Sequence, residues 1–110
     1  PMGCTAWLHD GLCEVWAPTQ GPGRLRNELA RVLGLDPDRI RIHRMFLGGG
    51  FGRRWQVDFG VQAALIARAA GGPVKLLWSR TEDLQHDFYR PAMTMRVRGA
   101  LRDGRLAGLD

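Results

Sequence analysis

The stretch with the clearest chemical potential is a run of three glycines followed by Phe51, Gly52 and two arginines, at residues 48–54. Glycine loses more backbone entropy on folding than any other residue, so consecutive glycines indicate positive φ angles or the close approach of another group. The run follows a strand-like segment and precedes a helix-like one, a junction at which backbone N–H groups can bind an anion. Arg53 and Arg54 add fork-shaped donors that match phosphate. The run therefore predicts an anion-receptive loop.

This loop does not follow the common nucleotide-binding patterns. A Walker A loop requires Gly-Lys-Ser/Thr after its glycines, and Arg53-Arg54-Trp55 does not supply it. A G-x-G-x-x-G register that starts at Gly48 fails because Arg53 occupies the last glycine position. The alternative is a tight turn with two solvated arginines, since glycine-rich turns are common.

Gln20 is a second candidate, in the turn-rich stretch from Pro18 to Gly23 between a predicted strand and a predicted helix. Side chains in such connections often contact ligands. A glutamine amide both donates and accepts hydrogen bonds, so it suits a ligand with oxo, sulfur or amide groups. The alternative for Gln20 is an exposed turn residue.

The other reactive residue types form no recognisable site. The three histidines are scattered, without the spacing of a metal site. Cys4 and Cys13 have no C-x-x-C arrangement, and the predicted hairpin places them too far apart to bridge, so both are expected to be buried thiols. Asp83 and Asp87 are expected in a solvated polar loop. Judged from its residues alone, the chain offers no catalytic group of its own.

The hydrophobic pattern predicts the elements that must position these residues. Alternating strands with a two-residue Asp-Gly turn predict a hairpin near each end of the chain, and two stretches with helical spacing lie between them. The first hairpin spans 4–9 and 12–17, the helices span 22–33 and 58–70, single strands span 40–47 and 74–79, residues 79–83 form a polar turn, and the second hairpin spans 93–100 and 106–109.

This order, ββαβαβββ, predicts a two-layer α+β fold with a mixed sheet and two helices. Residues 1–110 are expected to form a single domain, and both ends of the sequence suggest a piece of a larger polypeptide. The glycine run comes at the carboxyl end of its strand, where sheets of this kind place ligands.

The composition is that of a globular protein, with 45% hydrophobic and 25% charged residues. No apolar run approaches the roughly 18 residues of a membrane-spanning helix. The net charge is +5 and is carried almost wholly by arginine. This excess suits an anionic cofactor, an acidic neighbouring subunit or a nucleic acid.

Several motifs, in order, carry a resemblance to a known family: Val15-Trp16-Ala17-Pro18-Thr19-Gln20, the run from Gly48 to Arg54, and Ser79-Arg80-Thr81-Glu82-Asp83. The chain resembles the molybdopterin-binding large subunit of the molybdenum hydroxylases, the xanthine dehydrogenase and aldehyde oxidase family. Its opening residues 1–6, the paired arginines and Tyr89-Arg90-Pro91 are most similar to the β subunit of isoquinoline 1-oxidoreductase-type enzymes.

The resemblance implies roles for individual residues. Gln20 matches the glutamine beside the oxo ligand of molybdenum, and Phe51 and Gly52 match positions that contact the metal centre through backbone N–H groups. Gly49 and Gly50 match the same loop and let the cofactor lie close. The implied cofactor is molybdopterin, in its cytosine dinucleotide form, and we add Arg53 as a contact to its phosphates.

Trp55 marks a departure from the purine-oxidising members, which carry a glutamate at the matching position. Trp55 offers a flat apolar face instead. We therefore expect Trp55 to lie near the substrate, and the substrate of the parent enzyme not to be a purine.

The family reaction is hydroxylation of an aldehyde or of a carbon in an N-heteroaromatic ring. Its glutamate base belongs far downstream in the large subunit, so the isolated chain is expected to be inactive and to lack the cofactor. The implied partners are an iron–sulfur subunit and the remaining domains of the large subunit. The resemblance places the parent enzyme in the bacterial cytoplasm or periplasm.

The alternative function is a small basic binding module without catalysis. Trp7 and Trp16 fall on one face of the first predicted hairpin, as in a surface for an acidic protein or a nucleic acid, although a nucleic acid is the less favoured partner. Exposed sheet edges would also favour self-association into a homo-oligomer.

Overall fold

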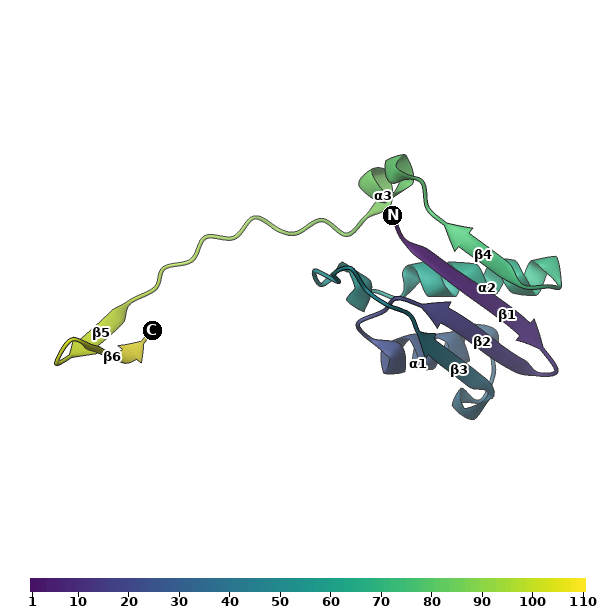
Figure 1. The fold of residues 1–110 in the computed structure, drawn as a ribbon, viewed down its shortest axis with the longest axis horizontal. Helices are drawn as coiled ribbons and strands as arrows, with labels where there is room; N and C mark the ends of the chain where they lie inside the picture. Colours follow the sequence, from purple (N-terminus) through teal and green to yellow (C-terminus); the bar gives the residue numbers. More distant parts are fainter.

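A computed structural model describes residues 1–110. Its largest part is a four-stranded mixed sheet in the order β3-β2-β1-β4 (Figure 1). The first two strands form an antiparallel hairpin, β3 is parallel to β2, and β4 is antiparallel to β1. The strands are β1 (Gly3–His9), β2 (Leu12–Ala17), β3 (Ile40–Arg44) and β4 (Val74–Leu77).

The first hairpin turns as predicted at Asp10-Gly11. Both residues have positive φ, 48° and 72°, as the tight two-residue turns of right-twisted hairpins require. His9 pairs with Leu12 and Leu8 with Cys13, which is the predicted register.

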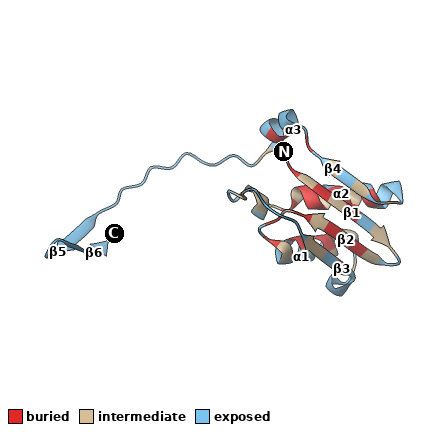
Figure 2. Ribbon diagram, viewed as in Figure 1, coloured by how far each residue is buried: buried red, intermediate tan, exposed pale blue.

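Two helices cover one face of the sheet and supply the other half of the core. They are α1 (Pro22–Leu33) and α2 (Asp58–Ala70), and they lie behind the sheet in Figure 1. Buried residues alternate along the strands that face them (Figure 2), which is the pattern of a sheet with one covered face. Cys4 and Cys13 are free and buried in this core, as predicted. The largest fully buried side chains are Phe59, Leu25, Leu29 and Val15 together with Cys13.

The opposite face of the sheet has no helix over it. Two histidine–indole stacks lie there, Trp7 on His9 with ring centroids 3.9 Å apart and Trp16 on His43 at 4.7 Å. Glu14 lies between the stacks, 3.2 Å from His9 Nε2 and 3.1 Å from His43 Nε2. Hydrogen bonding to Glu14 raises the pKa of His9, and the bonds from His9 and His43 lower the pKa of Glu14.

The predicted α+β class with a mixed sheet is confirmed, but several local predictions are wrong, and the chain has three helices rather than two. Residues 79–83, predicted as a turn, begin a third helix, α3 (Arg80–His86), because the Ser79 Oγ accepts from the Glu82 N–H at 3.0 Å. Asp83 is 7% exposed rather than solvated, and Asp87 faces Arg53.

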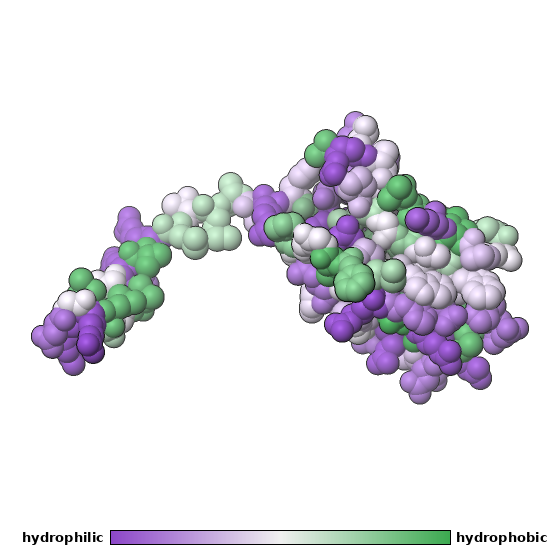
Figure 3. Space-filling model, in the orientation of Figure 1, coloured by the Kyte–Doolittle hydropathy of each residue, from purple (hydrophilic) through white to green (hydrophobic).

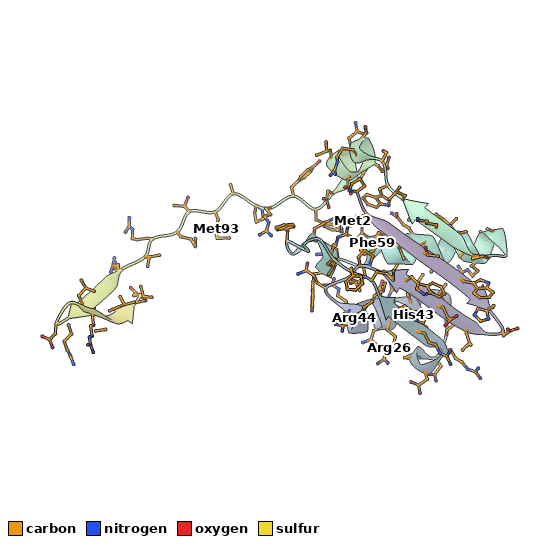
Figure 4. All side chains as sticks on the ribbon, viewed as in Figure 1. Met2, Arg26, His43, Arg44, Phe59 and Met93 are labelled. Carbon is orange, nitrogen blue, oxygen red and sulfur yellow. The ribbon has the colours of Figure 1, made fainter.

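The strand that leads to the glycines is shorter than predicted. β3 ends at Arg44, and Phe46 is fully exposed, because no partner strand continues beyond Ala17 of β2. His43 and Arg44 mark this end of β3 in Figure 4.

The second hairpin is also shorter than predicted and forms a separate sheet. It consists of β5 (Gly99–Arg102) and β6 (Arg105–Leu109), while residues 93–98 belong to no strand. Residues 89–110, which we call the C-terminal arm, extend away from the rest of the chain (Figure 1). The radius of gyration is consequently 19.3 Å, against roughly 13 Å for a compact domain of this length.

Apolar side chains are exposed along the whole arm (Figure 3), among them Met93, Leu101 and Leu106. None of the helices is long and apolar enough to span a membrane.

Candidate functional site

Two loops meet at one edge of the main sheet. The connector (residues 18–21) follows β2, and the glycine loop (residues 48–54) follows β3 after a short extended segment. Because β2 and β3 are parallel neighbours, their carboxyl ends lie at the same edge. The Met45 N–H donates to the Ala17 carbonyl at 3.1 Å and prolongs this alignment by one residue.

Gln20 and Gly52, both candidate residues from the sequence, are in direct contact. The Gly52 N–H donates to Gln20 Oε1 at 3.1 Å, and the Gln20 N–H donates to the Arg54 carbonyl at 3.0 Å. These two bonds join the connector to the glycine loop across the edge of the sheet. The Nε2 group of Gln20 donates to no protein acceptor and remains available to a ligand.

Thr19 supports this junction and was not among the predicted residues. Its hydroxyl donates to the Arg54 carbonyl and accepts from the Gly21 N–H, both at 3.1 Å, and the residue is 4% exposed. A threonine before a turn often bonds backbone two residues on, which was the available signal; its bond to Arg54 depends on the fold.

At two positions of the loop, Gly49 and Gly50, any larger residue would clash with a neighbouring side chain unless that side chain moved. A Cβ at Gly50 would lie 2.3 Å from Gln20 Cδ, and a Cβ at Gly49 would lie 2.4 Å from Phe51 Cε2. Gly49 also has a φ of +141° and Gly52 one of +78°. Phe51 itself adopts a left-handed φ of +51°, with its ring 79% exposed. The sequence from 49 to 52 therefore fits this backbone and its contact with Gln20.

Backbone donors are concentrated in this loop. The N–H groups of residues 46–51 donate to no protein acceptor. Unpaired N–H groups on a glycine-rich turn can donate to an anion or to an electron-rich oxygen.

The guanidinium of Arg53, the predicted phosphate contact, is engaged by carboxylates. Its Nη1 and Nη2 donate to the two oxygens of Asp58, each at 2.9 Å, and its Nε faces Asp87. Trp78 and Phe88 flank it, with ring centroids 5.6 and 5.2 Å from Cζ. Burial is the largest single influence and lowers the pKa of Arg53, but its hydrogen bonds to Asp58 and the negative charges of Asp58 and Asp87 together outweigh burial, so the pKa is raised.

Arg54 turns toward the connector. Its Nη1 donates to the Pro18 carbonyl at 3.3 Å, and burial lowers its pKa. The indole ring of Trp55 lies over Gly21, since a Cβ added at Gly21 would be 3.3 Å from the indole Cε3. Trp55 is nevertheless 49% exposed.

A groove of about 250 Å³ separates the glycine loop from the start of the C-terminal arm. Arg90 of the arm donates to the Phe51 carbonyl across this groove. The sequence identified Tyr89-Arg90-Pro91 only as a resemblance and did not place it against the loop. The groove is lined chiefly by Phe51, Gly52, Phe88, Tyr89 and Arg90.

The fold and these two loops can be compared with known protein families. The molybdopterin cofactor-binding domain family matches residues 1–110, the whole chain. The chain therefore belongs to this family, and the predicted kinship with the molybdenum hydroxylases is confirmed.

Particular relatives narrow the kinship further. The chain is 41% identical over 102 residues to the isoquinoline 1-oxidoreductase subunit beta of Brevundimonas diminuta. The aligned region covers 91% of this chain and 13% of that protein. Among solved structures it is similar to quinoline 2-oxidoreductase from Pseudomonas putida 86, with a TM-score of 0.69 and 25% identity over 77% of this chain and 11% of the other. Aldehyde oxidoreductase from Desulfovibrio gigas gives a TM-score of 0.71 and 26% identity over 79% and 10%. The chain thus spans only a small part of each of these relatives.

Proposed function

We propose that the connector and the glycine loop form one wall of a molybdopterin site in the large subunit of a hydroxylating oxidoreductase. The observation that carries this proposal is the contact of Gln20 Oε1 with the Gly52 N–H, beside the unpaired N–H groups of residues 46–51. This contact joins two candidate residues, Gln20 and Gly52, that were predicted separately.

The residues present fit such a cofactor. Gly49 and Gly50 keep the wall free of side chains, and the unpaired N–H groups supply donors for oxo or phosphate oxygens. We propose that Gln20 binds through its free Nε2 group and Phe51 through its unpaired N–H. Gly52, whose N–H is bonded to Gln20 Oε1, leaves space for the cofactor beside them because it has no side chain. When bound, the cofactor supplies oxygen transfer and two-electron oxidation; this chain positions it. We favour the cytosine dinucleotide form, which the resemblance implies.

We further propose an aldehyde or an N-heteroaromatic compound as the substrate. Trp55 is half exposed at the connector and offers an apolar ring where recognition of a purine would use a carboxylate. Two similar proteins, isoquinoline 1-oxidoreductase and aldehyde oxidoreductase, have names that agree with this choice, whereas a probable xanthine dehydrogenase subunit of Bacillus subtilis, 32% identical, is named for a purine.

The isolated chain is proposed to be inactive. The two carboxylates that contact the glycine loop, Asp58 and Asp87, are both engaged by Arg53, so neither is free to act as a base. An iron–sulfur subunit and the remaining domains of the large subunit would complete the enzyme.

The test is to produce the full-length large subunit with its iron–sulfur partner in a host that makes the cofactor. Oxidation of isoquinoline, benzaldehyde and xanthine is then compared for the unaltered enzyme and Gln20→Ala. We expect turnover of isoquinoline or benzaldehyde, loss of at least about tenfold in Gln20→Ala, and no urate from xanthine. Urate formation would refute the substrate class, and unchanged turnover in Gln20→Ala would refute the role of Gln20.

The open face of the sheet supports a second candidate, a binding module for an acidic partner. Trp7 is 37% exposed on this face, and Arg41 and Lys75 add positive charge beside it. This candidate predicts salt-sensitive quenching of tryptophan fluorescence by polyglutamate. Unchanged fluorescence at low salt would exclude it.

A further inference from the structure

We propose that Arg53 is a positioning residue that locks the glycine loop to the start of the C-terminal arm, rather than a ligand for phosphate. We call Arg53, Asp58 and Asp87 together the Arg53 brace. The contacts of the Arg53 brace lie within this chain and do not depend on the proposed cofactor site. Only their effect on cofactor binding rests on the proposed function.

The guanidinium of Arg53 is directed at protein groups, and its buried Nε makes an ion contact with Asp87 but no hydrogen bond. Three of its nitrogens face carboxylate oxygens, two of them on Asp58 in a paired, fork-like arrangement and one on Asp87. The side chain is 11% exposed, and aromatic rings of Trp78 and Phe88 lie 5.6 and 5.2 Å from Cζ. A guanidinium in this setting has little freedom to turn toward a ligand.

The charge of the brace also argues against a phosphate contact. One guanidinium and two carboxylates carry a net charge of −1, so an approaching phosphate would meet repulsion. The unpaired N–H groups of residues 46–51 remain the better donors for an anion.

The brace links three parts of the chain that the sequence separates. Arg53 follows Gly52 directly and begins the 3₁₀ turn Arg53–Trp55. Asp58 is the first residue of α2. Asp87 follows the last residue of α3 and precedes Phe88, which lines the groove. Holding Arg53 therefore fixes the backbone that presents the Gly52 N–H to Gln20 on one side. On the other side it holds the first residues of the arm against the loop.

Lysine would not replace arginine here. A lysine ammonium is a point charge without the planar fork that engages both oxygens of Asp58 while Nε faces Asp87. The brace thus explains a specific need for arginine at position 53.

The test is amide hydrogen exchange, followed by NMR on the 110-residue chain and on Arg53→Lys, Arg53→Met and Asp87→Asn. We expect exchange at Gly52, whose N–H donates to Gln20 Oε1, and at Phe88, whose N–H donates to Asp87 Oδ1, to accelerate together by about tenfold in both Arg53 variants, as expected from the loss of charged hydrogen bonds. Asp87→Asn should accelerate exchange at Phe88 alone. The core amide of Val15 should keep its rate in every variant.

Arg31→Met is the matched control, because Arg31 also makes a two-nitrogen contact with a carboxylate, Glu28, but on the exposed surface of α1. It should alter exchange at neither site. Unchanged exchange at both Gly52 and Phe88 in Arg53→Lys would overturn the proposal. If Arg53→Met fails to fold, Arg53→Lys and Asp87→Asn still decide it.

A second measurement, on the unaltered chain, tests whether Arg53 is a positioning residue or a ligand for phosphate. The Nε–Hε resonance of Arg53 is followed during titration with pyrophosphate. We expect no saturable shift at Arg53; a saturable shift there would show a phosphate ligand and overturn the proposal. Neither measurement requires the molybdenum cofactor, so failure of the proposed enzymatic function would leave these outcomes unchanged.

Discussion

The hairpins β1–β2 and β5–β6 turn at the same dipeptide and in the same conformation. Asp10-Gly11 has φ values of 48° and 72°, and Asp103-Gly104 has 52° and 74°. In the first hairpin Ala6, Val15 and Ala17 are completely buried, whereas every residue of the second is exposed. The same local sequence therefore forms the same turn in both places, and only the first hairpin has helices to pack against.

This comparison separates local from tertiary stabilisation. A two-stranded hairpin is at best marginally stable by itself in water, so burial has to supply the rest. We expect changes in the first hairpin and its core to alter the free energy of unfolding, and equivalent changes in the arm to leave it nearly unaltered.

The largest effect should follow truncation of Phe59, the largest fully buried side chain of the core. Phe59→Ala should lower the free energy of unfolding by about 3–5 kcal/mol through lost burial and the cavity left behind. Leu106→Ala, which removes a side chain 60% exposed in the arm, should change it by less than about 0.5 kcal/mol. Urea denaturation followed by circular dichroism measures both, and a comparable loss in the two variants would mean that the arm is packed in solution.

A smaller effect is expected at the glycine loop. Gly50→Ala places a Cβ against Gln20, an exposed side chain that can turn away, and should cost about 0.5–1.5 kcal/mol through loss of the hydrogen bond between the Gly52 N–H and Gln20 Oε1. Gly48→Ala is the matched control, because its φ is not positive and a Cβ there meets no atom within 4 Å. It should leave the free energy of unfolding unchanged or slightly raised, since alanine restricts the unfolded chain. Equal stabilities of the two variants would contradict the close contact of Gly50 with Gln20.

The third effect is a dependence on pH that involves His9 and Glu14 of the first hairpin. The raised pKa of His9 gives stability that is present below its ordinary value of 6.5 and is lost as the pH rises through the raised value. The lowered pKa of Glu14 gives stability that is present above its ordinary value of 4.5 and is lost as the pH falls through the lowered value. Asp10, at 3.2 Å from His9, and Arg41, at 3.9 Å from Glu14, are the other charged neighbours.

The contribution of this cluster should therefore be greatest between about pH 4.5 and 6.5. Melting temperatures from pH 3 to 9 should show both limbs in the unaltered chain, and Glu14→Gln should reduce both. Part of the acidic limb should remain, because the pKa values of Glu28 and Asp83 are also lowered, and part of the neutral limb should remain, because Asp10 also raises the pKa of His9. Glu28→Gln is the control, because Glu28 pairs with Arg31 and its loss should reduce only the acidic limb. A neutral limb of unchanged size in Glu14→Gln would disprove the assignment.

The smallest effect on stability should come from oxidation of the methionines. Met93 is 73% exposed in the arm, whereas Met2 is 6% exposed in the core; Figure 4 labels both. Dilute hydrogen peroxide should convert Met93 to the sulfoxide well before Met2, without a change in melting temperature. Mass spectrometry of the digested chain measures the order, and equal rates would show that the arm covers Met93 in solution.

The sequence predicted what depends on local periodicity and turn chemistry. The hairpin at Asp10-Gly11 and the helices α1 and α2 follow from spacing and from the residues at their ends. It failed at α3, where the pair Ser79 and Glu82 was a capping signal within a stretch too polar to suggest a helix. It failed at residues 93–98 because alternating apolar residues form a strand only where a partner strand exists.

Gln20 and the glycines became candidates from the sequence because their residue types are unusual for their positions, and the contact of Gln20 with Gly52 joins the two. The partners of Arg53 were not, because Asp58 and Asp87 come together only through the packing of α2 and α3. Ionic side chains alone do not indicate which opposite charge they will meet.

The most direct test of the cofactor site is the molybdenum content of the full-length large subunit carrying either Gly50→Ala or Gly48→Ala, purified from a host that makes the cofactor. A methyl group at residue 50 would occupy the space that Gln20 and the loop share, whereas one at residue 48 meets nothing. The account predicts that Gly48→Ala retains the molybdenum of the unaltered subunit and that Gly50→Ala loses most of it while remaining folded. Equal molybdenum in the two variants would contradict the claim that the glycine loop and Gln20 form a wall of the site.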